Sequence, residues 1–277
     1  MVDVGTVGIW QQREWYQEQS DDGLAELVAA GFHTLWLGSS PSTDLHEVER
    51  LLDRTNDVVV ATGVATVWGA PPEVAAAAYH RVLAKHPGRL LVGLGISHQV
   101  IVGAGYARPY EALVSYLDGL DAAPAPLPAS GRVLAALGDK TLRLAAERAA
   151  GVLPYLVTPE HTAKAREILG DGLVAPEQKV VLETDPTRAR AIARERLAQY
   201  LELPNYVRTW RRLGFTDDDV AAPGSDRLVD ALVAWGDEAA IRRRIDEHRA
   251  AGADHVAIQV LGADRLADMR TLGPVLN

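Results

Sequence analysis

The segment from Val58 to His98 constrains the fold of this chain more than any other stretch. Its first ten residues, 58–67, are rich in β-branched side chains and predict a buried strand. Residues 69–73 then open a helix, because proline is tolerated in a first helical turn and an acid there suits the helix dipole. Residues 89–95 form a second apolar strand. Strand, helix and strand within about forty residues make a βαβ unit with parallel strands. The inward face of its helix is predicted to carry Val74, Ala77, Ala78 and Val82.

The same alternation of strands and helices continues along the rest of the chain. Strands are predicted at residues 2–10, 33–37, 58–67, 89–95, 132–137, 152–157, 179–183 and 255–260. Eight strands alternating with helices is the count of a (β/α)8 TIM barrel of the α/β class, with a doubly wound sheet as the alternative. Residues 201–236, between strands seven and eight, predict extra helical segments. These are marked by Tyr206, Trp210, Leu213, Leu228, Leu232 and Trp235.

One domain over residues 1–277 fits this pattern. The 277 residues, 48% of them apolar, can bury a single large core, and a barrel of about 250 residues suits that length. Residues 121–131 contain three prolines and are the one linker-like stretch. Because the strand–helix rhythm resumes directly afterwards, we interpret this stretch as a loop between the halves of the barrel.

Composition limits the partners. A net charge of −9 argues against nucleic acid, which needs a basic face. The absence of cysteine excludes disulfides, thiolate metal ligands and thiol nucleophiles, and fits a reducing compartment. No leading signal segment and no apolar run of transmembrane length is present. We therefore expect a soluble, cytoplasmic protein that contacts neither membrane nor nucleic acid.

The histidines predict no metal site, but one of them lies where a barrel enzyme carries its chemistry. No His-x-His pair lies on the first strand and no His-Glu-x-x-His occurs, which gives a metal-dependent hydrolase little support. His98 comes directly after the fourth strand, at the rim where active sites are built. An imidazole there could donate a proton to a ligand or hydrogen-bond to it, and the alternative is a loop histidine without a role.

Glycines follow two strands that would be neighbours in the barrel. Residues 93–97 and residues 62–66 both combine glycine with small side chains, which either lets a flat ring approach the backbone or lets the strands pack closely. Trp10 and Trp68 are predicted at strand tips, as core side chains or as stacking platforms. Residues 138–141 begin a helix, whose free amides with Lys140 would favour a phosphate; a plain Asp139 helix cap is the alternative.

Four stretches together carry a family resemblance: residues 30–36, 61–64, 87–95 and 250–256. With them the chain resembles the bacterial-luciferase-like superfamily, and within it the deazaflavin-dependent oxidoreductases of actinobacteria. The resemblance implies a (β/α)8 barrel that binds coenzyme F420, or alternatively FMN, at its C-terminal rim. It also implies a non-proline cis peptide at Gly63–Val64 and a cofactor phosphate near residues 135–138. His98 stands where some relatives have a carboxylate, and Ser39 and Ser40 stand where one has a histidine.

The resemblance assigns residues to roles. His98 is the expected catalytic residue and proton donor, with no metal ligand. The expected cofactor-binding residues are Ser39, Gly63, Val64, Thr66, Gly95, Ile96, Ser97, Ala135, Ala136, Leu137 and Gly138. The implied activity is hydride transfer between reduced deazaflavin and a small organic substrate. A homodimer is the candidate assembly. An FMN-dependent monooxygenase and a non-catalytic cofactor-binding protein remain the alternatives.

Overall fold

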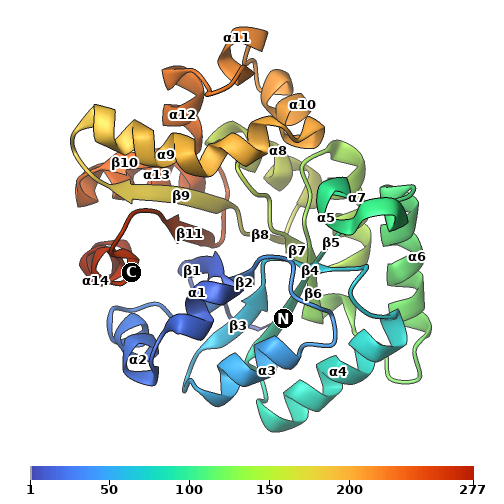
Figure 1. Ribbon diagram of the computed structural model, residues 1–277. Coiled ribbons are helices and arrows are strands. Elements are labelled where there is room, and N and C mark those ends of the chain that lie inside the picture. Colours follow the sequence, from blue (N-terminus) through green and yellow to red (C-terminus); the bar gives the residue numbers. More distant parts are fainter. Residues whose placement is uncertain (1) are drawn as a thin grey trace.

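A parallel sheet curls around the centre of the molecule and helices cover its outside (Figure 1). The computed structural model describes residues 2–277, apart from the side chain of Ile101. The strands are β1 Val7–Gln12, β2 Thr34–Gly38, β3 Val59–Thr62, β4 Ala65–Thr66, β5 Leu90–Gly95, β6 Arg132–Leu134, β7 Gly151–Val152, β8 Leu173–Val174, β9 Glu177–Leu182, β10 Val233–Gly236 and β11 Val256–Val260. The helices are α1 Arg13–Glu18, α2 Asp21–Ala29, α3 His46–Asp53, α4 Pro72–Lys85, α5 Gln99–Val102, α6 Pro109–Ala122, α7 Asp139–Arg148, α8 Pro159–Leu169, α9 Pro186–Leu201, α10 Pro204–Arg212, α11 Asp217–Val220, α12 Asp226–Leu232, α13 Glu238–Ala250 and α14 Arg265–Leu276.

The strand order closes into a barrel. Neighbours run β11-β1-β2-β3-β5-β6-β7-β8, all parallel, with β4 also pairing β5. The break between β8 and β9 is only Ala175 and Pro176, and hydrogen bonds continue across it. Glu177 N donates to Pro154 O (2.8 Å) on the β7 side, and Ala257 N donates to Pro176 O (2.9 Å) on the β11 side. Since β8 and β9 are two halves of one strand, the barrel has the eight strands that the sequence predicts.

The structure adds a strand that the sequence analysis missed. Residues 201–236 were expected to be helical as far as Trp235, but α12 ends at Leu232 and Val233–Gly236 forms β10 beside β9. The reason is local: β7 is only two residues long, which leaves the second half of β9 with an unpaired edge. Val233 is β-branched, and Trp235 pairs with Val181 of β9. These residues suit an extended strand at that edge better than another helical turn.

Helix α4 turns a different face inward from the predicted one. Ala78 and Val82 are buried as expected, but Val74 is 42% exposed and Ala77 is also exposed. Ala75, Ala76 and Tyr79 take the inward positions instead. Tyr79 sets this rotation, because its ring lies over Gly131, where an added Cβ would come within 2.4 Å of the Tyr79 hydroxyl.

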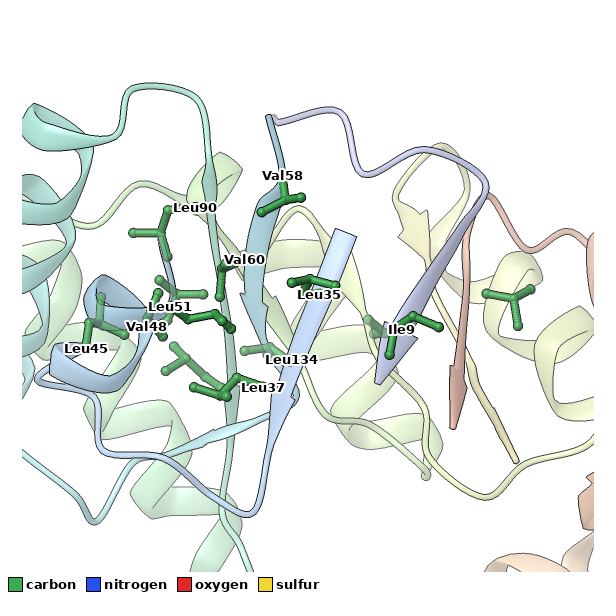
Figure 2. Close-up of a cluster of buried hydrophobic side chains, with 14 of the residues drawn as sticks. Ile9, Leu35, Leu37, Leu45, Val48, Leu51, Val58, Val60, Leu90 and Leu134 are labelled. Atoms are coloured by element: carbon green, nitrogen blue, oxygen red, sulfur yellow. The ribbon is translucent and has the colours of Figure 1, made fainter. Parts of the chain in front are cut away.

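The main core lies between the sheet and the helices. Figure 2 shows one part of it, where outward side chains of β2 and β3, among them Leu35, Leu37 and Val60, meet Val48 and Leu51 of α3. A separate cluster fills the inside of the barrel with Trp10, Trp36, Leu91, Val133 and Leu153 among its members. A third cluster joins α9, α10 and α12, and Trp210 anchors it by donating from Nε1 to Leu156 O (3.0 Å).

His255 lies inside the barrel and makes stability depend on pH. Its Nε2 accepts from Trp36 Nε1 (2.9 Å) and its Nδ1 donates to Gly5 O (2.9 Å), so the buried ring is neutral and a second proton has no acceptor. Burial lowers the pKa of His255 from 6.5 to about 4. Between pH 6.5 and pH 4 the imidazole is protonated in the unfolded chain but neutral in the folded chain. The free energy of unfolding therefore falls as the pH falls. We expect this group alone to lower the free energy of unfolding by about 3 kcal/mol between pH 7 and pH 4.

Urea unfolding at pH 7, 5 and 4 measures this effect. His255→Gln should flatten the decline, whereas a change at the exposed His46 to Gln should leave it unaltered. An equally steep decline in His255→Gln would show that other groups cause it.

Candidate functional site

The C-terminal ends of four neighbouring strands bring most of the predicted site residues together. Ser40 Oγ, after β2, lies 3.4 Å from Ser97 Oγ, after β5. A Cβ built at Gly95 would lie 2.5 Å from Val64 Cγ2 and 3.2 Å from Ala135 Cβ, so the ends of β3, β5 and β6 touch. Residues that are distant in the sequence therefore form one continuous surface at this rim.

The Gly63–Val64 peptide bond is cis, as the family resemblance implies. Its carbonyl is fixed from the barrel interior, since Trp10 Nε1 donates to Gly63 O (2.7 Å). The indole of Trp10 also lies against Gly38 and Gly63, where added Cβ atoms would be 2.3 and 2.4 Å from it. The space left by these two glycines is therefore filled by Trp10 itself, and the core interpretation of Trp10 is correct.

Close packing of strands explains Gly93 and Gly95. A Cβ at Gly93 would lie 1.9 Å from Thr62 O, and Thr62 Oγ1 donates to Gly93 O (2.7 Å). The two strands approach too closely there for any side chain. Contact of this backbone with a cofactor ring stays a prediction for Gly95, Ile96 and Ser97.

Trp68 and Thr66 contact the segment of residues 95–97 that follows β5. Trp68 Nε1 donates to Ile96 O (2.8 Å), which holds the backbone after β5 in place. Thr66 forms a bridge with Ser42 and is partly buried. Ser39 is exposed and adopts a positive φ of 64°, and Ser97 has a φ of 54°. These side chains are uncharged, but the Ser39 hydroxyl interacts with the carboxylate of Glu14 and helps to lower the pKa of that group.

Residues 135–138, which follow β6, lie partly at the rim of the barrel and partly in the core. Ala135 is partly exposed beside Gly95, whereas Ala136 is buried in the core between the sheet and the helices. The side chain of Ala136 therefore points away from the rim, and only its backbone can take part in binding. The carbonyl of Leu137 is already engaged, because it accepts from His161 Nε2 (2.9 Å).

Helix α7 begins at this segment with free amides. Gly138 is its N-cap, and no side chain caps it. Asp139 pairs with Lys164 (2.5 Å) instead of capping, so the helix-cap alternative for Asp139 is wrong. Lys140 lies over the ring of Tyr110 (3.6 Å). The cation beside Gly138 is Arg212 of α10, whose Nη1 would be 3.7 Å from an added Cβ.

His98 stands at the start of α5, half-buried under α10. Its ring lies 5.7 Å from that of Tyr206, centroid to centroid. Burial lowers the pKa of His98 below its ordinary value of 6.5, so the imidazole is mostly neutral at pH 7. Tyr206 in turn neighbours Tyr155 and Tyr200, which places an aromatic cluster over the mouth of the barrel.

A buried ion pair lies beneath these aromatic rings, and the sequence analysis did not find it. Lys179 Nζ lies 3.0 Å from Glu177 Oε1, and both side chains are fully buried. The ammonium also lies 3.9 Å from the centre of the Tyr155 ring, and Tyr155 Oη donates to Gln259 Oε1 (3.0 Å). Burial lowers the pKa of Lys179 to about 8 and raises that of Glu177, each opposed by the attraction between them. The signal in the sequence was two charged residues at alternate positions of a strand, which places both on one face.

Comparisons with known proteins bear on the fold, although no family model matches the chain. The chain is 24% identical to a Mycobacterium tuberculosis protein named as a coenzyme F420-dependent oxidoreductase, over 94% of this chain and 97% of that protein. Among solved structures, an F420-dependent secondary alcohol dehydrogenase in complex with an F420-acetone adduct superposes with a TM-score of 0.76 and 12% identity, covering 99% of this chain and all of the other. The FMN complex of the oxygenating constituent of 3,6-diketocamphane monooxygenase from Pseudomonas putida superposes with a TM-score of 0.62 and 13% identity, over 99% and 97% of the two chains. The chain has the luciferase-like barrel fold. The fold that the sequence resemblance implies is thereby confirmed.

Other features of this luciferase-like barrel lie apart from its rim. Two surface hollows have volumes of about 260 and 140 Å³, one along β10 and α13 and one between α1 and α3. Among residues 2–277, no cluster of three or more histidine and acidic side chains could hold a metal ion. Within the same range, no helix has both the length and the apolar character needed to cross a bilayer. The rim therefore remains the place where polar groups from several strands converge.

Proposed function

We propose that this luciferase-like barrel is an F420-dependent oxidoreductase that exchanges a hydride between the reduced deazaflavin and a small organic substrate. The observation that carries this proposal is the contact of Val64, Gly95 and Ala135 at one rim, followed directly by the uncapped start of α7. The similarity to an F420-dependent relative and to an F420-bound structure supports the choice of cofactor. When bound, the deazaflavin supplies the hydride chemistry, and the chain supplies position and electrostatics.

The start of α7 fits a phosphate group. Free amides at a helix N-terminus and the positive end of its dipole favour an anion, and Arg212 adds a full positive charge beside Gly138. An added Cβ at Gly138 meets nothing closer than Arg212 Nη1 at 3.7 Å, so the backbone is open to a ligand. Gly138, Leu137 and Arg212 would hold the phosphate end of the cofactor, with Ser39, Val64, Thr66 and residues 95–97 toward its ring.

His98 is the proposed proton donor. Reduction of a polar double bond by hydride also needs a proton, and the half-buried imidazole lies at the end of β5 beside Tyr206. Burial lowers the pKa of His98, so the neutral ring predominates at pH 7. The protonated ring, which is the form that donates a proton, becomes more populated as the pH falls. The serines of the rim can orient a substrate by hydrogen bonding, but they hold no proton that is acidic enough.

Equilibrium titration of the purified protein with oxidised F420, and separately with FMN, tests the cofactor. We expect a saturable change in the absorbance of F420 and weaker binding of FMN. Tight binding of FMN together with no binding of F420 would overturn the proposal. That result would favour an FMN-dependent monooxygenase, the alternative that the similarity to an FMN-bound monooxygenase structure supports.

Gly138→Val should weaken cofactor binding. The backbone at Gly138 has φ −108° and ψ 155°, which valine adopts, and the Cβ has room, so the fold should persist. A branched side chain would nevertheless cover the amides that face a phosphate. We expect the dissociation constant for F420 to rise about tenfold or more, the equivalent of one lost charge-assisted hydrogen bond. Gly138→Ala is the graded control and should have a smaller effect; equal affinity in all three proteins would show that the phosphate lies elsewhere.

A further inference from the structure

A second positively charged site lies on the opposite side of the barrel mouth. Gln12, the last residue of β1, lies between the guanidinium groups of Arg196 and Arg265. Arg196 comes from the last turns of α9, and Arg265 begins α14. Arg265 Nη1 also donates to Gln11 Oε1 (3.2 Å).

The cluster has more donors than it can satisfy. With one orientation of its amide, Gln12 Oε1 lies 3.5 Å from Arg265 Nη1; with the other, it accepts from Arg196 Nη1 (2.8 Å) and Nη2. In the first orientation the amide NH2 faces the guanidinium of Arg196, donor against donor, and the second orientation removes this conflict. The oxygen of Gln12 therefore reaches only one guanidinium at a time, and most of the five N–H donors of each arginine have no acceptor among these side chains.

Neither arginine has an acidic partner. Within residues 2–277, no carboxylate lies within 4.0 Å of either guanidinium, although other arginines of α9 are paired. Arg190 Nη2 lies 2.6 Å from Asp230 Oδ2, and Arg194 contacts Asp226. Both Arg196 and Arg265 are partly buried. The carboxylates that act on them, Glu177 on Arg196 and Glu18 on Arg265, are not in ion-pair contact. Two partly buried like charges without an ion-paired carboxylate repel each other, and a bound anion would stabilise them.

The strand order fixes where this cluster lies relative to the cofactor. β6, which leads to α7, is the fourth strand from β1 in either direction around the eight-stranded barrel. The start of α7 and the Gln12 cluster are therefore on opposite sides of the mouth. Trp10 precedes Gln12 by two residues on β1, so both side chains point into the barrel and Trp10 lies deeper. The pairing of β1, β11 and β9 places Gln259 and Lys179 at the level of Trp10. A molecule that reaches from the start of α7 to the Gln12 cluster would therefore lie above the layer of Trp10, Gln259 and Lys179.

We propose that Arg196, Arg265 and Gln12 bind an oxyanion group, a carboxylate or a phosphate, of the substrate. The planar forks of two arginines match the paired oxygens of such a group, and Gln12 contributes an amide N–H once its oxygen is turned to one arginine. The assignment of this anion to the substrate rests on the proposed function, which places the cofactor phosphate at α7. The substrate class is then an organic acid or a phosphate ester whose reducible group lies toward the centre of the mouth.

Calorimetric titration with succinate and with inorganic phosphate tests the site without any cofactor. We expect both anions to bind the wild-type protein, and Arg196→Gln and Arg265→Gln each to weaken binding about tenfold or more, as loss of a charge-assisted hydrogen bond does. Arg194→Gln is the matched control on the same helix, already paired with Asp226, and should bind as the wild type does. Equal affinities in all four proteins, or no binding to the wild type, would overturn the proposal.

Cofactor titration of the same variants separates the two sources of an anion. If the anion belongs to the substrate, Arg196→Gln and Arg265→Gln keep the wild-type affinity for F420. A parallel loss of F420 affinity would assign the cluster to the cofactor and overturn the substrate assignment. Circular dichroism and urea unfolding serve as the fold control, and since each change removes one of two repelling charges, stability should not fall. Anion binding that persists while F420 fails to bind would contradict the proposed function alone.

Discussion

His98→Ala is expected to lower turnover by roughly 100- to 10,000-fold, the range that a general acid contributes, while the affinity for F420 stays at the wild-type level. His98 lies just past the end of β5, where the cofactor ring and the substrate should meet. Its ring contacts Tyr206 and makes no side-chain hydrogen bond to any residue between 2 and 277, so it is not committed to a structural partner. Steady-state kinetics with reduced F420, together with cofactor titration, measures both quantities.

His98→Gln is the sharper control, because it keeps a hydrogen-bond donor and removes the titration. Burial lowers the pKa of His98, so the protonated ring is scarce at pH 7 and increases as the pH falls below 6.5. The wild-type turnover number should therefore rise toward lower pH, and the rise should be absent in His98→Gln. Unchanged turnover in His98→Ala would leave solvent or Tyr155 as the proton source and would refute the assignment.

Lys179→Met is expected to lower the free energy of unfolding by about 3–5 kcal/mol, the loss found when one partner of a buried ion pair is removed. The carboxylate of Glu177 would remain fully buried without its ion-pair partner, stabilised by the amide of Leu156 (3.2 Å to Oε2) and by the more distant charge of Arg196. Urea unfolding at pH 7.5 measures the loss. Because burial raises the pKa of Glu177, the variant should recover part of its deficit, relative to the wild type, when the pH is lowered and the carboxyl binds a proton.

The double variant Glu177→Gln/Lys179→Met is the matched control. A neutral amide can still accept from Leu156 N, and methionine fills a similar volume without a charge, so most of the lost stability should return. A double variant that is as unstable as Lys179→Met would show that the lost packing around Tyr155, and not the unpaired charge, causes the deficit.

Much of the fold could be predicted from the sequence because periodicity reports which side chains are buried. The eight barrel strands and the helix start at Pro72 were found because β-branched runs and proline are strong local signals. The rotation of α4 and the extra strand β10 were missed because tertiary partners decide them. Tyr79 over Gly131 sets the first, and the free edge of β9 sets the second.

The candidate site could be predicted less completely. Neighbouring strand ends bring Gly95, Val64 and Ala135 together, as strand order alone requires. Ala136 faces the core, because side chains alternate along an extended segment. The ion pair of Lys179 and the cluster at Gln12 could not be found in this way. Glu177 and Lys179 alternate on one strand, but only the tertiary packing shows that the face they share is buried. The members of the cluster at Gln12 lie far apart in the sequence, and an arginine without a partner has the same sequence signature as one with a partner.

Turnover of reduced F420 by the purified protein, followed through the absorbance of the oxidised deazaflavin, tests the central claim most directly. An organic acid or phosphate ester with a carbonyl group is the acceptor, and an uncharged carbonyl compound of similar size is the comparison. We predict that oxidised F420 accumulates in step with the alcohol product, and faster with the anionic acceptor. Reduced F420 that binds but stays unoxidised with every acceptor would contradict hydride transfer and leave a protein that only binds the cofactor.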